Sequence, residues 1–354
     1  MDGVLAALYG CENDSKNVGH GGSLPNVTRW LGDIRTYFPS PVVRVMQKDA
    51  LDRLGLQRML LEPEMLEAVE PDVHLVATLI SLGRVIPEKT KDSARRVVRK
   101  VVEELERRLA RETEQAVRGA LNQAARTSRP RPADIDWERT IRANLKNYLP
   151  ELGTIIPEKL VGHARRKMTA KLRDIVLCVD QSGSMATSVV YSGIFGAVLA
   201  SIRAVNTRMV VYDTSVADLT EDLQDPVDLL FGTQLGGGND TPRALAYCQS
   251  IITRPAETVM VLVTDCYEGG LSEAMLERTA RILDSGVTMV CLLALSDDGA
   301  PSYDRRQAAA MASLGVPTFA CTPDLFPGMM AAAIQKQDLD LWAARNEIVT
   351  TRGS

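Results

Sequence analysis

The residues that decide the fold of this chain are DIVLCVDQSGSM, from Asp174 to Met185. The apolar run that precedes Asp180 is rich in β-branched residues, and it predicts a buried strand. Asp180 ends this strand, and Ser182 and Ser184 follow at alternate positions on a tight loop before a helical pattern. One carboxylate and two hydroxyls therefore stand at the C-terminal end of a strand, where open α/β sheets bind ligands.

Composition excludes several classes of protein. The chain has 354 residues, a net charge of −4 and 45% hydrophobic residues, so we expect a soluble protein of about two domains without a basic field for nucleic acid. Six cysteines form no C-x-x-C pair, which favours buried, reduced thiols and a cytoplasmic location. We expect neither a signal peptide nor a membrane-spanning helix, because the N-terminus lacks a basic region and no run of 18 apolar residues occurs.

Strand and helix patterns alternate from Asp174 to residue 336, which predicts an α/β fold with a doubly wound, mostly parallel sheet. The expected strands are 174–180, 208–213, 216–220, 258–264, 288–295 and 317–321. The expected helices are 189–204, 225–231, 241–253, 271–285, 303–314 and 324–336.

Helical patterns dominate the first half of the chain. Residues 72–82 and Lys91–Arg126 carry apolar residues at three- and four-residue steps. A further helix is expected over Asp136–Leu149, with one apolar side made of Trp137, Ile141, Leu145 and Tyr148.

Three segments follow from these patterns. We expect a mainly α-helical N-terminal domain with a linker over residues 1–170, an α/β domain over 171–336, and a C-terminal tail over 337–354.

Two later loops carry further side chains with oxygen atoms, each next to a predicted strand or helix. The loop LGGGNDTPRAL contains Asn239 and Thr241, and its glycines allow the backbone to approach an ion closely. Pro242 suits the first turn of a helix, which predicts Thr241 as the N-cap. Asp265 ends the strand TVMVLVTD. Asn239 offers an amide oxygen and Thr241 a hydroxyl, and simple helix capping is one possible role of Thr241.

These motifs resemble the von Willebrand factor A (VWA) domain, and the resemblance covers residues 171–336. The form D-x-S-G-S-M, followed by G-G-G-x-D-x-x-R-A-L, is most similar to intracellular bacterial VWA proteins of the CoxE-like group and to VWA partners of MoxR-type AAA+ ATPases. The segment TIRANLKNYLPELGTIIPEKL also resembles the leaders of such proteins.

The resemblance implies a metal-ion-dependent adhesion site that holds Mg²⁺, or Mn²⁺ or Ca²⁺ in its place. Its residues would be Asp180, Ser182, Ser184, Asn239 or Thr241, and Asp265, which in this family commonly acts through a water. The chain departs from the family at two places. Asn239 stands where many relatives have threonine, and CYEGG follows Asp265 where T-D-G is usual, with Tyr267 and Glu268 expected at the rim.

The expected function is binding rather than catalysis. The chain has no G-x-S-x-G motif and no P-loop, and its three histidines all precede Asp180. We therefore expect a cytoplasmic, metal-dependent adaptor without enzymatic activity, whose metal accepts a carboxylate from a protein partner and which links a MoxR-type AAA+ ATPase to client proteins. No contact with a membrane is expected.

Two other functions were weighed against this one. A nucleic-acid-associated VWA protein of the ribonucleoprotein type is the alternative, suggested by a basic cluster made of Arg165, Arg166, Lys167, Lys171 and Arg173. A hydrolase that uses the metal to activate water is disfavoured by the scarcity of general bases near the motif.

Overall fold

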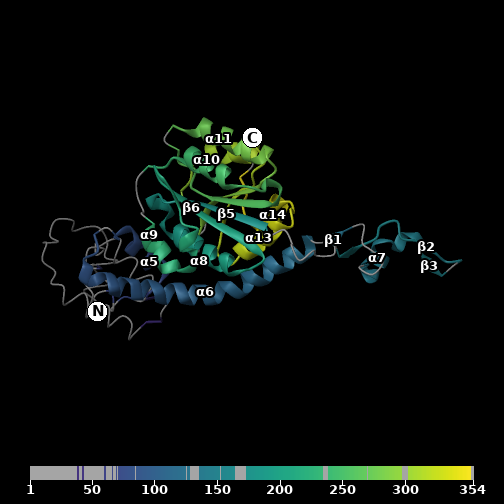
Figure 1. The fold of residues 1–354 in the computed structure, drawn as a ribbon, viewed down its shortest axis with the longest axis horizontal. Helices are drawn as coiled ribbons and strands as arrows, with labels where there is room; N and C mark the ends of the chain where they lie inside the picture. Colours follow the sequence, from purple (N-terminus) through teal and green to yellow (C-terminus); the bar gives the residue numbers. More distant parts are fainter. Residues whose placement is uncertain are drawn as a thin grey trace.

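The structure of the chain is a computed structural model. It describes residues 71–351 except 84, 125, 128–134, 152, 164–172, 234–237, 269 and 297–301, together with residues 38–39, 42–43, 60, 66 and 69. Figure 1 shows a twisted sheet between two layers of helices, with one long helix below it and a small lobe standing apart from it. The expected helical N-terminal domain is therefore described mainly from residue 71 onward.

The central sheet has six strands and is parallel except at one edge, as the alternating pattern predicted. In spatial order the strands are β10 (Thr318–Cys321), β9 (Thr288–Leu295), β8 (Thr258–Val263), β5 (Arg173–Asp180), β6 (Val205–Tyr212) and β7 (Val216–Asp218). The chain passes from β5 to β6 on one side and later returns to β8 on the other side of β5. The switch point between β5 and β8 therefore lies beside Asp180, where such folds bind ligands.

Helices cover both faces of the sheet. One face carries α8 (Ala186–Ser201), α9 (Pro226–Gly232), α13 (Phe326–Ile334) and α14 (Leu339–Arg345). The other carries α10 (Thr241–Ile251), α11 (Ser272–Asp284) and α12 (Arg305–Ser313). The strands are almost wholly buried because both faces are covered, which explains their continuous apolar runs.

Helix α8 follows the Asp180 loop and lies at the centre of the larger core. Its segment Gly183–Ser201 is long and apolar enough to cross a membrane by length and composition, but 72% of it is buried inside the fold, as expected for a core helix. Gly196 brings α8 close to the sheet, because a Cβ atom there would lie 2.9 Å from Leu223 Cδ2 and 3.2 Å from Met209 Sδ.

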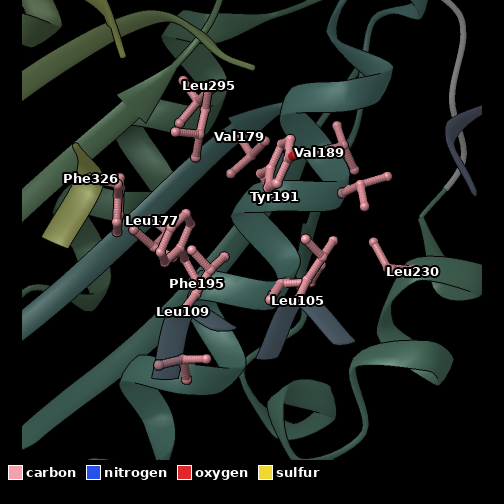
Figure 2. Packing of buried hydrophobic residues seen from close by; sticks show 14 of the residues in the cluster. Leu105, Leu109, Leu177, Val179, Val189, Tyr191, Phe195, Leu230, Leu295 and Phe326 are labelled. Carbon is pink, nitrogen blue, oxygen red and sulfur yellow. The ribbon is translucent and has the colours of Figure 1, made fainter. Parts of the chain in front are cut away.

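The N-terminal helices share this core. Helix α5 (Val73–Ser81) packs against α8, and the 37-residue helix α6 (Glu88–Ala124) packs against α8 and α13. Figure 2 shows Leu105 and Leu109 of α6 packed in the same cluster as Phe195 of α8 and Phe326 of α13. Hydrophobic burial therefore joins residues from both sides of the boundary expected near residue 170.

The lobe at the far end of α6 differs from the sequence expectation. Helix α7 covers only Trp137–Ala143, and the short elements that follow are η3 (Leu145–Asn147), β2 (Tyr148–Leu149) and β3 (Thr154–Ile155). The predicted helix over Asp136–Leu149 is therefore wrong after residue 143. Asn144 ends it, because its side-chain amide bonds to backbone groups of the segment 158–159.

Leu109→Ala should destabilise the whole α/β fold, because Leu109 is fully buried between α6 and the sheet helices. We expect a loss of about 2–5 kcal/mol in the free energy of unfolding, in a single transition measured by circular dichroism and tryptophan fluorescence in urea. Leu341→Ala is the control, since Leu341 is half exposed. A separate early transition of the helical signal, with the remainder unchanged, would contradict a shared core.

Candidate metal centre

Asp180 is fully buried at the carboxyl end of β5, although it is an acid. Its Oδ1 accepts a hydrogen bond from the backbone N–H of Ser182 at 2.8 Å. Its Oδ2 accepts from Asn239 Nδ2 at 3.2 Å and from Thr264 Oγ1 at 3.0 Å. The Asp180 carboxylate therefore forms hydrogen bonds with the first loop through Ser182, with the second loop through Asn239, and with Thr264 at the end of β8.

The two serines of the first loop lie together beside the third loop. Ser182 Oγ and Ser184 Oγ are 3.2 Å apart, and Ser184 Oγ donates to Asp265 Oδ2 at 2.5 Å. Asp265 is almost fully buried, and its Oδ1 accepts from the backbone N–H of Tyr267 at 3.3 Å. The structure thus brings Asp180, Ser182, Ser184 and Asp265 to one place, from the ends of β5 and β8.

The second loop places Asn239 and Thr241 differently. The amide of Asn239 contacts Asp180 and lies in the cleft at the sheet edge. Thr241 is fully buried, and its hydroxyl donates to the Tyr212 hydroxyl at 3.0 Å. Of the two candidates for the second-loop ligand, these contacts favour Asn239.

The prediction that Thr241 caps helix α10 was wrong. Asp240 is the N-cap, and its carboxylate accepts from the backbone N–H of Arg243 at 3.0 Å. Thr241 and Pro242 are the first two residues of the helix. Simple capping is therefore not the role of Thr241, which bonds to the end of β6 instead.

Cys266 is the residue at which the third loop departs from the usual T-D-G pattern. Its φ angle is +62°, in the left-handed region that favours glycine. The residue turns the chain sharply after Asp265, and its backbone N–H bonds to Thr264 Oγ1 at 3.1 Å. A buried thiol, in contact with the core on the α10–α12 face, therefore takes a position that glycine would occupy without strain.

An open cleft of about 430 Å³ lies over these groups. Its lining consists of Ser182, Ser184, Gly238, Asn239, Asp265, Tyr267, Glu268 and Asp304. The expected rim positions of Tyr267 and Glu268 agree with this lining. Asp304 was missed; its backbone N–H bonds to the Asp265 carbonyl at 2.9 Å, and it caps α12. An acid immediately before a helical pattern was the only sequence signal for it.

No positively charged side chain occurs among the described residues that line the cleft. Burial raises the pKa of Asp180, against hydrogen bonds from Ser182 and Asn239, and Asp265 raises it further. Burial also raises the pKa of Glu268 to about 7, partly opposed by Thr241. Both carboxylate oxygens of Glu268 are buried without a hydrogen-bond partner of normal geometry. Such carboxylates are stabilised by a nearby cation.

The donor set fits a hard divalent cation such as Mg²⁺, Mn²⁺ or Ca²⁺, because every side-chain donor is an oxygen or an amide. Within the described part of the chain, no three His, Cys, Asp or Glu side chains converge as a metal site. Hydroxyls, the Asn239 amide and waters would therefore have to complete the coordination beside one or two carboxylates.

Two other expectations concern residues outside the cleft. The five cysteines within the described residues are free and buried, as predicted, and Cys11 lies outside that part. In the basic cluster, Arg173 is paired with Glu257 at 2.6 Å. The other four members, at residues 165–171, lie outside the described residues.

Asp180→Asn should weaken binding of Mn²⁺ by at least roughly tenfold, because it removes the charge around which the three loops are arranged. Isothermal titration calorimetry with Mn²⁺ measures this. The matched control is Asp284→Asn, on an exposed residue at the end of α11. Thermal unfolding in EDTA checks that the variant is folded. Equal Mn²⁺ affinity in the wild type and Asp180→Asn would refute the site.

Glu268 should make the metal-free protein less stable at high pH. Its pKa is about 7 in the folded chain against an ordinary 4.5, so the folded state holds a proton that the unfolded chain releases. The bound proton stabilises the folded chain fully when the pH is below the pKa of Glu268 in the unfolded chain. This contribution is lost as the pH rises through the pKa of Glu268 in the folded chain. In EDTA, Glu268→Gln should therefore lose less stability than the wild type between about pH 5 and about pH 8.

Urea unfolding at each pH measures the effect of Glu268, and Glu273→Gln is the exposed control. Parallel pH profiles for the wild type and Glu268→Gln would show that the Glu268 carboxylate is not the titrating group.

The comparisons with known proteins agree with this geometry. Residues 107–330 match the family model described as VWA domain containing CoxE-like protein. The uncharacterized protein YehP of Escherichia coli (strain K12) is 34% identical over 340 residues, which are 95% of this chain and 90% of that protein.

Solved structures with related folds have low sequence identity. BatB from Bacteroides thetaiotaomicron has a TM-score of 0.36 at 14% identity, over 46% of this chain and 98% of that chain. A von Willebrand factor type A protein from Catenulispora acidiphila has a TM-score of 0.35 at 15% identity, over 48% and 43%. Manganese-loaded TRAP from Plasmodium vivax has a TM-score of 0.29 at 17% identity, over 34% and 57%.

The family assignment rests on the sequence matches, which cover most of the chain and of the E. coli relative. The mostly parallel six-stranded sheet with helices on both faces is the fold that the assignment implies. The chain belongs to the family of VWA-domain-containing CoxE-like proteins.

Proposed function

We propose that this chain is a cytoplasmic, metal-dependent adaptor that binds proteins, has no enzymatic activity, and works with a MoxR-type AAA+ ATPase on client proteins. VWA domains mediate protein–protein interactions, and the CoxE-like family is generally linked to MoxR ATPases. The proposal adds that this chain itself binds such an ATPase and its clients through a bound metal ion.

The observation that carries the proposal is the cleft at the carboxyl edge of the sheet. Hydroxyls of Ser182 and Ser184 face it, whereas Asp180 lies buried beneath them. Neutral hydroxyls at the surface would hold a cation without cancelling its charge, and the open side leaves room for an outside ligand. A bound Mg²⁺ would supply an electrophilic position for a carboxylate of the partner protein.

The residues of the chain position that contact. Asp180 holds the first and second loops together through its bonds to Ser182 and Asn239. Asp265 fixes Ser184 from the third loop. Tyr267 is 48% exposed at the rim, and its hydroxyl lies 2.6 Å from Ser302 Oγ. The rim therefore offers an exposed tyrosine beside the polar cleft, and tyrosine is enriched in protein–protein interfaces.

The lack of a suitable base within the cleft supports binding rather than hydrolysis. A hydrolase would need a general base or acid poised over a substrate. Among the described residues that line the cleft there is no histidine, lysine or cysteine, and Asp265 is already held by Ser184 and the Tyr267 N–H. Burial raises the pKa of Glu268 to about 7, but both of its carboxylate oxygens are buried.

An affinity pull-down from the native host in Mg²⁺ and in EDTA tests the function. We expect an AAA+ ATPase or its client to be retained by the wild type in Mg²⁺, and to be lost in EDTA and with Asp180→Ala. The physical reason is that both treatments remove the ion-bridged carboxylate contact. Quantitative mass spectrometry of the retained proteins measures it.

Asp284→Ala is the matched control for the pull-down, because it removes an exposed acid at the opposite edge of the sheet. It should retain the same proteins as the wild type. A partner retained equally by folded Asp180→Ala and by the wild type in EDTA would refute the metal-bridged contact.

A further inference from the structure

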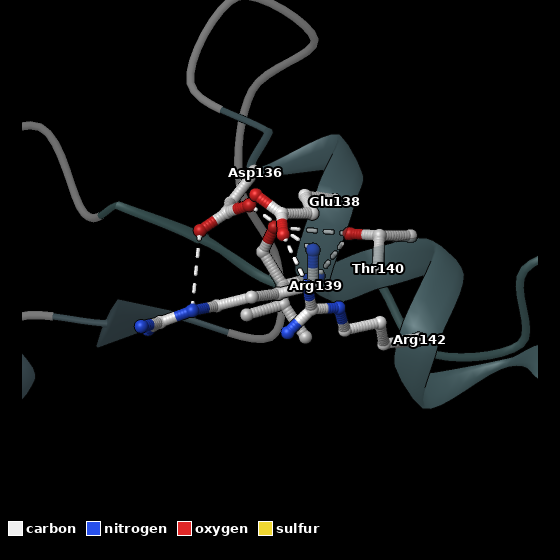
Figure 3. A network of polar contacts seen from close by, with 6 residues as sticks. Asp136, Glu138, Arg139, Thr140 and Arg142 are labelled. Carbon is white, nitrogen blue, oxygen red and sulfur yellow. Dashed lines mark hydrogen bonds and ion pairs between the residues drawn. The ribbon is translucent and has the colours of Figure 1, made fainter.

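The carboxylate of Glu268 is buried without a partner among the described residues. Both of its oxygens are buried, and neither has a hydrogen bond of normal geometry. Acids elsewhere in the fold are matched by a base, and Figure 3 shows Asp136 beside Arg139 and Glu138 beside Arg142. A buried carboxylate that has neither a base nor a hydrogen bond is costly. A group from outside the described chain is therefore expected to compensate it.

Glu268 lies at the cleft that holds the predicted metal ligands. It lines this cleft together with Ser182 and Ser184 of the first loop. It follows Asp265 by three residues, and the left-handed backbone of Cys266 turns the chain between them. The third loop therefore brings a second carboxylate to the cleft, in addition to that of Asp265.

The charges that act on Glu268 are negative. Burial raises the pKa of Glu268 most, and the charges of Asp180 and Asp240 raise it further, opposed in part by Thr241. No lysine, arginine or histidine occurs among the described residues that line the cleft. Two carboxylates that lie near each other without a base repel, and this repulsion destabilises the fold unless a cation lies with them.

The neighbouring acids already have partners. Asp265 accepts from the Ser184 hydroxyl through Oδ2 and from the Tyr267 N–H through Oδ1. Asp240 accepts from a backbone N–H in the first turn of α10. Of these three acids, Glu268 is the one whose carboxylate oxygens are buried and unpartnered, so it is the acid best suited to take a metal ion as its partner.

We propose that Glu268 is a second carboxylate ligand of the divalent cation, beside Asp180, and that it competes with the carboxylate of a partner protein for that ion. Asp180 with neutral hydroxyls leaves a divalent ion with net positive charge, whereas two carboxylates balance it. A balanced ion attracts a further carboxylate less strongly. Two carboxylates with neutral oxygens also agree with the finding that no three His, Cys, Asp or Glu side chains converge within the described residues.

This inference rests on the metal-bridged contact proposed above and adds a restraint to it. A partner carboxylate would reach the ion by displacing Glu268, which lines the same open cleft. The chain would then bind strongly only to partners whose contacts around the cleft compensate the loss of that internal ligand.

The first test is the affinity of the purified full-length chain for Mn²⁺, measured by isothermal titration calorimetry. Glu268→Gln keeps the size of the side chain and removes its charge, so Mn²⁺ should bind at least roughly tenfold more weakly. Glu273→Gln removes the same charge from an exposed position on α11 and should bind Mn²⁺ as the wild type does. Thermal unfolding in EDTA checks that both variants are folded.

The second test measures competition for the ion, with acetate as the carboxylate probe. Water-proton relaxation of the Mn²⁺-saturated chain reports water bound to the ion. Glu268→Ala should raise the relaxation rate, because water takes the place of the side chain. Acetate should then lower that rate at a concentration at least roughly tenfold smaller in Glu268→Ala than in the wild type, because no internal carboxylate competes with it. A residue that only supports the loop would change neither quantity.

Wild-type affinity for Mn²⁺ in folded Glu268→Gln would overturn the inference, as would acetate that acts equally on the wild type and on Glu268→Ala. Asp180→Asn separates this result from failure of the metal site. If Asp180→Asn loses Mn²⁺ and Glu268→Gln does not, the site stands and the role of Glu268 falls. If both variants bind Mn²⁺ as the wild type does, both fall. No partner protein enters these measurements, so the pull-down tests the adaptor separately.

Discussion

The burial of Asp180, with no positively charged side chain among the described residues that line the cleft above it, is the constraint on which the binding edge depends. Its carboxylate lies at the end of the central strand β5, beneath the surface of the cleft. Burying an acid is costly unless it is hydrogen-bonded or compensated by a cation. Bonds from the backbone of Ser182, from Asn239 and from Thr264 offset part of this cost. These same bonds set the positions of the loops around the cleft.

The rest of the fold supports this edge. Helix α8 leaves the Asp180 loop and runs through the centre of the larger core, between the sheet and α6. Movement of the loop would therefore have to be accommodated by tightly packed residues such as Tyr191 and Phe195, which are fully buried. Helix α6 packs on α8 and α13. The N-terminal helices are therefore connected to the cleft through α8, which follows the Asp180 loop.

The molecule presents two surfaces with opposite chemistry. The cleft consists of hydroxyl, amide and carboxylate oxygens, and it suits a charged contact bridged by an ion. The lobe around Trp137 exposes apolar side chains with paired charges beside them. Figure 1 shows the lobe and the carboxyl edge at different ends of the described fold, so the lobe does not cover the cleft.

The sequence by itself determined the strands, the helices of the α/β part and the first and third loops, because long apolar runs and an acid at a strand end depend on local pattern. Only the tertiary structure decided how the remaining residues are used. Aspartate and threonine are both favourable N-cap residues, so the sequence alone does not distinguish Asp240 from Thr241. In the structure Thr241 turns inward and bonds to Tyr212. The row from Trp137 to Leu145 is as regular as that of a core helix. Whether such a row is buried depends on what packs against it, and here the hydrogen bonds of Asn144 turn a polar side inward instead.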